Sequence, residues 1–446
     1  MLTLLDFFCD FASSQRLAEE AFIVGGTVRD ILLDRQIKDA DIVVKDDAEK
    51  IGRSFADAAG ASFALLDRDF GIVRVARNNE FIDICTMHGS SILDDLANRD
   101  LTINSMAMPL ERFRSKQLKA GSLNSKQIAE TLQALIIDPF DGQRDLKYKM
   151  IRMVSEANLV SDPLRLLRVY RFAAELHFSI EVSTASAVRA HAPMISSPAA
   201  ERIAEELRHI LRANNSYSTI KDMEETDLLF NLFPVLAELT TDIWHQVKQS
   251  YRYAEHILHN LSLYFPERSA PIQEYFVDET RTFCLKFAIL FQYSVTADKM
   301  ARRLKLSRRE IDLVHMLNVN HTVITTLGDE RKQVVIGLLR ELGDDVYALL
   351  VFALATGRVC QLSGSPLASL TREIVAAYHD EFMPRRSRLP LIDGNDLICE
   401  FELSPSPFFK KVLSSIELLA LEGRITSRAE ALAEAGRMIR EKDIGS

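Results

Sequence analysis

The chain has 446 residues, a length that indicates about two to four domains rather than one core. Hydrophobic residues make up 47% and charged residues 26%, a balance that excludes an intrinsically disordered chain. A net charge of −9 is unusual for a nucleic-acid-binding protein, but basic residues gather at Arg165–Arg171, Lys299–Arg309 and Arg385–Arg388. Solvated helix faces or turns would explain these clusters equally well.

Membrane and secretion signals are missing from the pattern. The longest apolar run, Val346–Ala355, is too short to span a bilayer, and Met1–Asp6 lacks the basic region of a signal peptide. The five cysteines are scattered without a C-x-x-C pair, which argues against a zinc ribbon and a disulfide framework. We therefore expect a cytoplasmic protein that does not engage a membrane. The sequence sets no oligomeric state.

Short strand and helix patterns alternate up to about residue 155. Apolar and β-branched runs predict strands at 21–24, 39–44, 72–76 and 81–85, and a helix at 48–59. Arg77–Glu80 predicts a hairpin turn between the last two strands. After Asp162 helical periodicity dominates. The pattern predicts an α+β head over 1–155, a helical neck over 156–225 and a helical body and tail over 226–446.

Two acidic residues open the second predicted strand. Side chains at i and i+2 of a strand share a face, so Asp39 and Asp41 project together. Two adjacent carboxylates repel each other unless a cation lies between them, and oxygen ligands suit Mg²⁺. If the strand holding Asp83 pairs alongside, three carboxylates could hold two metals for phosphoryl transfer. By itself, a D-x-D match is more often an exposed turn.

A glycine pair follows the first predicted strand. Gly25 and Gly26 precede a helical pattern, an arrangement that lets backbone N–H groups and a helix N-terminus approach phosphate. Arg29 could add positive charge to the same site. No G-K-[ST] follows, so this is not a Walker motif. The alternative is a tight turn with a surface Arg29–Asp30 pair.

A third motif begins at Ser161. Asp162 before Pro163 is typical of a helix cap, which is its structural explanation. Asp162 and Arg165 also share a helix face, because they are three residues apart. A carboxylate accepts from the exocyclic amines of C and A, and a guanidinium donates to ring acceptors. The pair could therefore accept C and A and reject G and U.

These motifs together resemble the class II tRNA nucleotidyltransferase and bacterial poly(A) polymerase family. The match is strong over about residues 21–207 and weak beyond. Five segments carry it in the family's order: Phe22–Asp30 with Asp39–Asp41, Arg99–Ala107, Asp138–Gly142 with Asp145–Leu146, Asp162–Arg168 with Arg171–Ala174, and Glu201–Ile203 with Glu206–Leu207.

The resemblance implies a polymerase-β-like nucleotidyltransferase head with a small mixed sheet, followed by an all-α neck, body and tail. It implies that Asp39 and Asp41 bind Mg²⁺, and that the partners are the tRNA 3′ end with CTP or ATP. It further implies the following nucleotide contacts: Arg99 and Asp100 on the ribose side, Asp162 and Arg165 as a protein template, and Arg168 as a further nucleotide-holding residue.

The chain departs from the family pattern in places. Ser161 and Asn98 stand where the family usually has an acid and an arginine. The family usually has a longer flexible loop before its second motif, whereas Met87–Ser91 leads almost directly into Ile92–Leu96. A shortened loop resembles the CC-adding subtype, so we expect addition to stop before the terminal A.

Other functions stay open at this point. Some relatives carry a His-Asp hydrolase domain behind the neck, but Gln292 and Tyr293 stand where its His-Asp pair would be. We expect that region to be degenerate and without phosphohydrolase activity, with His256 and His321 structural. The rivals are a poly(A) polymerase, which shares the head motifs, and a non-catalytic RNA-binding protein.

Overall fold

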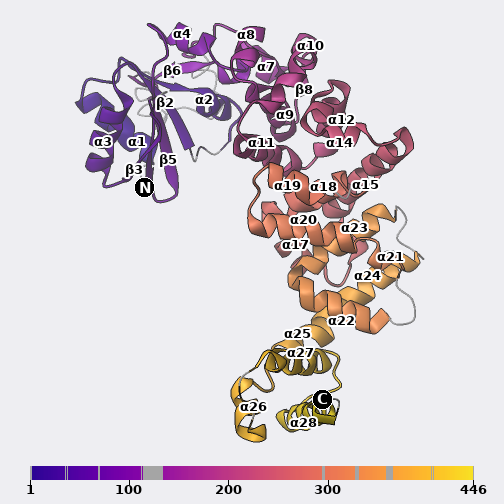
Figure 1. The fold of residues 1–446 in the computed structure, drawn as a ribbon. Coiled ribbons are helices and arrows are strands. Elements are labelled where there is room, and N and C mark those ends of the chain that lie inside the picture. The colour runs from indigo at the N-terminus through magenta and orange to yellow at the C-terminus, as the bar shows by residue number, and fades with distance from the viewer. Residues whose placement is uncertain are drawn as a thin grey trace. The chain divides into compact units, whose positions relative to one another are not determined.

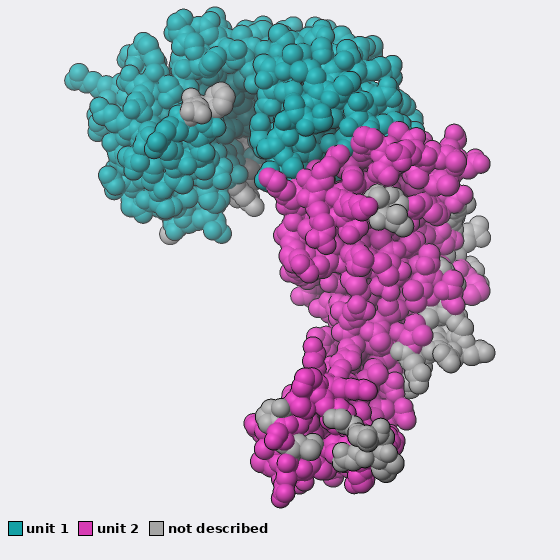
Figure 2. Space-filling view, viewed as in Figure 1, with its two compact units in different colours: residues 1–232 teal, residues 233–446 magenta. Residues whose placement is uncertain are grey.

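The computed structural model describes residues 3–444 except 36, 38, 69–70, 112, 114–133, 294–296, 327–330, 358–364, 403 and 405. The chain forms two compact units, Met1–Leu232 and Phe233–Ser446, which Figure 2 distinguishes by colour. Figure 1 labels their helices and strands. All strands among the described residues lie in the first unit. In the described part of the chain, no helix is long and apolar enough to cross a bilayer. The division at about residues 155 and 225 stays a prediction.

One mixed sheet organises the first unit. Its strand order is β3-β4-β5-β2-β1-β6, and β2 and β5 are the parallel pair among antiparallel neighbours. The predicted α+β head is therefore confirmed, although β3 and β6 were not expected. The strands are β1 (Ala21–Val24), β2 (Asp39–Val44), β3 (Ser62–Asp67), β4 (Ile72–Arg77), β5 (Glu80–Thr86) and β6 (Ala107–Pro109).

A two-residue turn joins β4 to β5 and fixes their register. Asn78 and Asn79 have φ angles of 51° and 62°, as a type I′ hairpin turn requires, and Asn tolerates this conformation better than most residues. Arg77 consequently faces Glu80, and the same register places Arg74 opposite Asp83. The predicted hairpin turn is confirmed.

Helices cover the sheet and extend the first unit beyond it. The helix α3 is capped by Asp47 at its start and by Gly60 at its end, which explains its predicted bounds. A second, two-stranded sheet pairs β7 (Met150–Ile151) with β8 (Ser179–Ile180). The helices of this unit are α1 (Leu4–Ser14), α2 (Gly25–Leu32), α3 (Ala48–Ala59), α4 (Ile92–Ala97), η1 (Thr102–Asn104), α7 (Gly142–Lys147), α8 (Glu156–Ser161), α9 (Leu164–Leu176), α10 (Val182–His191), η3 (Ala192–Ser196), α11 (Ala200–Arg212), α12 (Ser216–Glu225) and α13 (Leu228–Leu232).

The second unit is helical throughout its described residues. The apolar run at Val346–Ala355 forms α23, which is buried on all sides and packs against α15 and α18. The elements are α14 (Pro234–Ala237), α15 (Thr241–His259), α16 (Leu261–Tyr264), α17 (Ser269–Tyr275), α18 (Glu279–Leu290), α19 (Ala297–Arg303), α20 (Arg308–Asn320), α21 (Val323–Thr326), α22 (Arg331–Leu342), η4 (Gly343–Asp345), α23 (Val346–Thr356), α24 (Pro366–Ala377), the π-helical η5 (Tyr378–Phe382), α25 (Met383–Arg386), α26 (Gly394–Phe401), α27 (Pro407–Leu421) and α28 (Arg428–Ile444).

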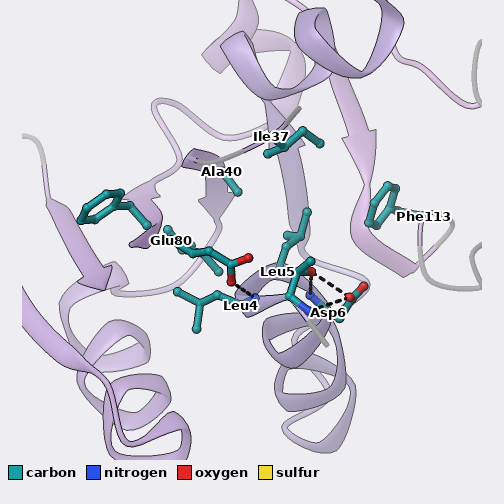
Figure 3. A pocket seen from close by; sticks show the side chains of 10 residues that line it. Leu4, Leu5, Asp6, Ile37, Ala40, Glu80 and Phe113 are labelled. Carbon is teal, nitrogen blue, oxygen red and sulfur yellow. Dashed lines mark hydrogen bonds between the residues drawn. The ribbon is translucent and has the colours of Figure 1, made fainter. Parts of the chain in front are cut away.

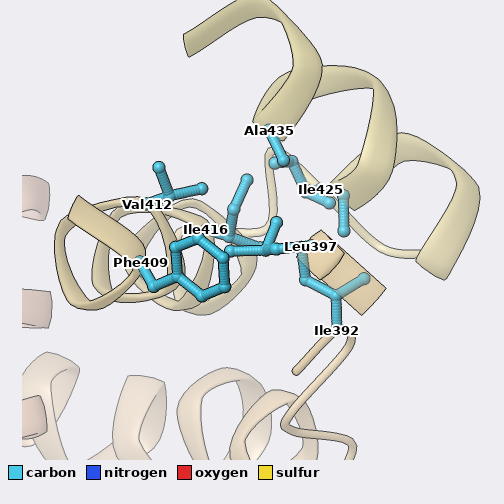
Figure 4. Packing of buried hydrophobic residues seen from close by; sticks show 8 residues of the cluster. Ile392, Leu397, Phe409, Val412, Ile416, Ile425 and Ala435 are labelled. Carbon is cyan, nitrogen blue, oxygen red and sulfur yellow. The ribbon is translucent and has the colours of Figure 1, made fainter. Parts of the chain in front are cut away.

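The end of this unit has a small core of its own. Leu397 of α26, Val412 and Ile416 of α27 and Ala435 of α28 pack together there (Figure 4). Each of these helices is amphipathic and buries one apolar stripe, so the three stabilise one another.

The two residues aligned with the His-Asp pair differ in their surroundings. Tyr293 is half-exposed, and its hydroxyl donates to the side chain of Gln246 over 2.9 Å. Gln292 is buried, and its amide nitrogen and oxygen have no hydrogen-bond partner among the described residues. His321 stacks on Phe352 with ring centroids 4.7 Å apart, and His256 packs edge-on against Tyr264. The absence of phosphohydrolase activity stays a prediction.

Candidate active site

A row of charged side chains crosses three neighbouring strands. In the parallel pairing of β2 with β5, Asp41 lies directly opposite Asp83. In the antiparallel pairing of β5 with β4, Asp83 lies opposite Arg74. Asp39 shares the face of Asp41 because it is two residues away on the same strand. We call Arg74, Asp83, Asp41 and Asp39 the carboxylate row. The predicted proximity of the three acids is confirmed.

Arg74 holds one member of the row with both arms of its guanidinium. Its Nε and Nη2 donate to the two carboxylate oxygens of Asp83, each over 2.7 Å. The pKa of Arg74 is raised, first by the hydrogen bond to Asp83 and then by the attraction of Asp83, Asp39 and Asp41, against the opposing effect of burial. The arginine therefore faces all three acids.

The glycine turn lies against Asp41. Gly25 has a φ of 64°, and a methyl group placed on it would come within 2.7 Å of Arg99 Nη1 and 3.4 Å of Asp41 Oδ2. The same substitution at Gly26 would come within 3.4 Å of Asp41 Oδ2. The Gly26 N–H donates to the Asp41 carboxylate, and Asp41 N–H donates to Thr27 Oγ1 over 2.7 Å. The turn and the acid thus form one site, with space that only glycine leaves open.

Asp41 is held in an environment that opposes its charge. Burial raises the pKa of its carboxyl, and Asp83 adds to this effect, while Arg99, Arg29 and the Gly26 N–H act in the opposite direction. A group whose ionised form is disfavoured gains from any cation that binds beside it. The site is therefore more favourable with an added positive charge.

The donor set of Asp39 and Asp41 fits a hard divalent cation. Carboxylate oxygens on one strand face suit such an ion, and Asp39 is exposed enough to reach it. No group of three or more His, Cys, Asp or Glu residues is arranged to hold a metal ion within the described ranges. Asp83 adjoins the pair and is bound by Arg74. The possibility that all three carboxylates hold two metals stays a prediction.

Arg99 connects the site to the short segment after β5. Its Nε and Nη2 donate to Asp95 Oδ2 over 3.1 and 2.9 Å, and Asp95 also accepts the His88 N–H. The same segment is fixed at its start, where the Met87 N–H donates to the Val44 carbonyl over 2.8 Å. Residues 87–91 are therefore a tightly bonded connection rather than a long loop.

Asp100 and Arg168 form an ion pair in which the carboxylate is buried and the arginine is partly exposed. Arg168 Nε donates to Asp100 Oδ2 over 2.6 Å, and the Leu101 N–H donates to Asp100 Oδ1. Burial alone would raise the pKa of Asp100, but Arg168, with smaller contributions from Arg165 and the Leu101 N–H, lowers it to about 2. The carboxylate is thus ionised at neutral pH, and it fixes the position of Arg168.

Three arginines surround one aromatic ring. The guanidinium carbons of Arg29, Arg168 and Arg171 lie 5.0, 5.3 and 4.5 Å from the centroid of Phe172, which is itself buried. We call these four residues the arginine cluster. Cations over an aromatic face are attracted to it. The ring therefore fixes the side-chain positions of residues from α2 and α9.

Each arginine of the cluster is also paired. Arg29 donates to both oxygens of Asp30 and, through Nη1, to Asn104 over 2.8 Å. The Arg29–Asp30 pair that we gave as an alternative is therefore present, but Arg29 is buried and does not lie on the surface. Arg171 donates to Glu206 over 3.1 Å.

The two residues expected to select the base lie at the start of α9. Asp162 Oδ1 accepts the Leu164 N–H, the cap-like contact that its position indicates, and Oδ2 accepts from Arg202 over 2.8 Å. Arg165 uses Nη1 to donate to the Asn158 carbonyl over 3.1 Å. Carboxylate oxygens accept more than one hydrogen bond, and a guanidinium has further N–H groups, so capacity is left for a base.

Sequence reasoning missed several neighbours of these residues. Arg74 could have been found, because the predicted hairpin already pairs position 74 with position 83. Asn104 and Glu206 could not be given contacts in this way, since their partners lie in distant segments of the chain. The contact of Phe172 with Arg168 follows from their spacing of four residues on one helix, but its contact with Arg29 does not.

A separate cavity of about 240 Å³ lies beside β2 and β5 near the start of α1 (Figure 3). Ala40 and Ile82 line it, and they alternate with Asp41 and Asp83, so they point away from the carboxylate row. The Leu4 N–H donates to Glu80 at its edge. The cavity is therefore distinct from the candidate site.

Comparisons with known proteins agree with this geometry. Residues 21–152 match the poly A polymerase head domain, and residues 177–240 match the probable RNA and SrmB-binding site of polymerase A. A CC-adding tRNA nucleotidyltransferase of Synechocystis sp. is 29% identical over 94% of each chain. A CC-adding tRNA nucleotidyltransferase of Geobacter sulfurreducens is 38% identical over 43% of this chain and 40% of its own. An A-adding tRNA nucleotidyltransferase of Deinococcus radiodurans is 28% identical over 94% of this chain and 96% of its own.

Solved structures share the fold. A CCA-adding enzyme in complex with ATP has a TM-score of 0.66 at 23% identity, covering 98% of this chain and 95% of its own. The Thermotoga maritima CCA-adding enzyme in complex with tRNA has a TM-score of 0.61 at 23% identity and covers 96% of each chain. With the matching head and RNA-binding segments, the full-length likeness to the Synechocystis enzyme leads to one conclusion: residues 21–152 are a poly A polymerase head domain, and the chain is similar over its length to tRNA nucleotidyltransferases.

Proposed function

We propose that the protein adds C and/or A nucleotides to the 3′ end of tRNA without a nucleic-acid template. Within this reaction class we propose the CC-adding subtype, which uses CTP and stops before the terminal A. The observation that carries this is the carboxylate of Asp41 lying against the Gly25–Gly26 turn, with Asp39 on the same face. The names of full-length relatives, which include a CC-adding and an A-adding enzyme, support tRNA as the acceptor. We expect the reaction to take place in the cytoplasm.

In the proposed reaction, the tRNA 3′-hydroxyl oxygen forms a bond to the α-phosphorus of the nucleotide. The bond from that phosphorus to the bridging oxygen breaks, and pyrophosphate and a proton are released. The backbone at Gly25–Gly26 leaves room for phosphate oxygens, and Arg99 lies beside it to balance their charge. The pair Asp100–Arg168 holds the nucleotide side of the site in place.

Asp39 and Asp41 would hold the divalent ion that nucleotidyltransferases of this family use, and we propose Mg²⁺. When bound, such an ion stabilises negative charge on the attacking and leaving oxygens. The environment of Asp41, in which burial disfavours its ionised form, is consistent with such a partner.

The restriction to CC addition is supported by the short connection after β5. Residues 87–91 are tied to Val44 and Asp95, so they offer no long loop that could rearrange for a second base. The CC-adding names of the Synechocystis and Geobacter relatives favour the same subtype.

Product length on two acceptors tests the proposal. A tRNA lacking its last three nucleotides should gain two residues with CTP, and a tRNA ending in CC should gain none with ATP. Addition of A at a comparable rate would overturn the CC restriction, and long A tails on unrelated RNA would favour a poly(A) polymerase. No extension by a folded protein would leave RNA binding without catalysis.

Base choice offers a second test. Arg165→Ala should raise UTP incorporation relative to CTP by about tenfold or more, because a lost hydrogen-bonding pair costs about 1–3 kcal/mol of discrimination. The measurement is single-turnover incorporation with each nucleotide alone. Equal losses for CTP and UTP would contradict a template role for Arg165.

A further inference from the structure

One member of the carboxylate row is a cation supplied by the protein itself. We propose that Arg74 is a positioning residue of the divalent-ion site: it holds Asp83 out of the coordination sphere and leaves the ion to Asp39 and Asp41. This inference rests on the proposed function, since it concerns the ion that the reaction uses.

The strand register is the first support. Arg74 faces Asp83 across β4 and β5, and Asp83 faces Asp41 across β5 and β2. Neighbouring strands lie about 4.8 Å apart, so the guanidinium and the expected ion site flank Asp83 from opposite sides. Asp83 can thus be neutralised from either side.

The geometry of the pair favours the arginine. Both oxygens of Asp83 are engaged by separate N–H groups at 2.7 Å, which is the bidentate arrangement that gives the strongest carboxylate pairing. The ring of Phe81 lies 5.3 Å from the guanidinium carbon of Arg74 and restricts its motion. A carboxylate in this state keeps further lone pairs, but its orientation is fixed and its charge is offset by the arginine, so it is a weaker ligand for an ion.

The net charge of the carboxylate row depends on the Arg74–Asp83 pair. With Arg74 in place, the row of three acids and one base has a net charge of −2, which one divalent cation neutralises. Without the arginine the same acids would carry −3, and the attraction for a cation would increase. The position of Arg74 therefore sets the affinity of the site for its ion.

An ordinary cross-strand ion pair is the competing explanation. The Arg74 side chain is 39% exposed, and exposed pairs on a sheet often contribute little. Such a pair would leave ion binding unchanged when it is removed. A third possibility is that Asp83 leaves Arg74 and becomes a ligand when the ion binds.

Mn²⁺ binding to the full chain separates these explanations without any substrate. The free Mn²⁺ signal in electron paramagnetic resonance would be titrated with wild type, Arg74→Gln, Asp83→Asn and the double variant. We expect Arg74→Gln to bind Mn²⁺ about three- to tenfold more tightly, and Asp83→Asn to bind it more weakly by a similar factor. The double variant should return to within about twofold of wild type, because one charge of each sign is removed and both ligands stay.

Two outcomes would overturn the proposal. Unchanged affinity in Arg74→Gln would make the pair a surface contact without a role in ion binding. Weak binding in the double variant, equal to that in Asp83→Asn, would make Asp83 a ligand. Arg77→Gln is the matched control, since Arg77 lies on the same strand but outside the row and bonds to the Ala59 carbonyl; it should bind Mn²⁺ as wild type does.

Folding and function are checked separately. Far-ultraviolet circular dichroism and thermal unfolding of each variant show whether it folds. If Arg74→Gln does not fold, Arg74→Met keeps the aliphatic stem against Phe81 and repeats the test. In the CTP assay, the Mg²⁺ concentration for half-maximal rate should fall in Arg74→Gln by the factor seen with Mn²⁺. A wild type that binds Mn²⁺ but extends no tRNA would refute the proposed function and leave the role of Arg74 testable.

Discussion

On β2, Asp39 and Asp41 form no ion pair with any described residue, whereas each arginine of the arginine cluster, from α2 and α9, is paired with an acid. Burial raises the pKa of Asp41, while pairing with Arg168 lowers that of Asp100 to about 2. Both carboxyls are largely buried in the same unit. The strand site is thus electrostatically incomplete and favours a ligand, and the helix site is complete and provides a scaffold.

We expect the largest effect from a substitution in the strand site. Asp41→Asn should reduce CTP incorporation by at least about a thousandfold, because the oxygen that would hold the ion is lost. The free energy of unfolding should stay equal or rise, since an unfavourably buried charge is removed. Single-turnover kinetics and urea unfolding measure the two quantities. A large loss of stability together with activity would show that Asp41 belongs to the scaffold instead.

A substitution in the helix site should instead lower the free energy of unfolding. Asp100→Asn removes the closest carboxylate from the partly buried Arg168, so we expect a loss of about 1–3 kcal/mol in the free energy of unfolding. Asp100 has a pKa of about 2 in the folded protein, below its usual 3.8. Its contribution is therefore fully present above about pH 4 and is lost as the pH falls toward 2.

Urea unfolding of wild type and Asp100→Asn at several pH values measures this contribution. The difference between the two proteins should be constant from pH 7 to 5 and smaller at pH 3. A difference that grows as the pH falls would contradict the assignment of the pair. Arg202→Ala, which removes the partly exposed partner of Asp162, is a control expected to change stability by less than about 1 kcal/mol.

The same contrast explains which contacts could be predicted from the sequence. The face shared by Asp39 and Asp41 follows from strand alternation, and the contact of Arg74 with Asp83 follows from the hairpin turn at Asn78–Asn79. Both depend on local rules. The parallel register of Asp41 with Asp83 has no turn to fix it, so it depends on packing of the whole sheet.

The contacts of the arginine cluster could not be predicted from local rules. Asn104 bonds to Arg29 across 75 positions, and Asp100 bonds to Arg168 across 68. Such contacts depend on how α9 packs against the head, which periodicity does not determine. The family motifs included these residues, Phe172 among them, but the resemblance gave no role to the ring that the arginines share.

We expect the smallest and most specific effect from replacing the ring of Phe172. Phe172→Leu keeps an apolar side chain of similar size but removes the aromatic face from Arg29, Arg168 and Arg171. We expect a loss of about 1–2 kcal/mol in stability, with a raised KM for CTP and little change in kcat, because the arginines keep their acidic partners but lose their alignment. Phe172→Tyr, which retains the ring, is the matched control for KM. A fall in kcat with unchanged KM would mean that the cluster acts on the reacting atoms, and the distinction between scaffold and ligand site would then fail.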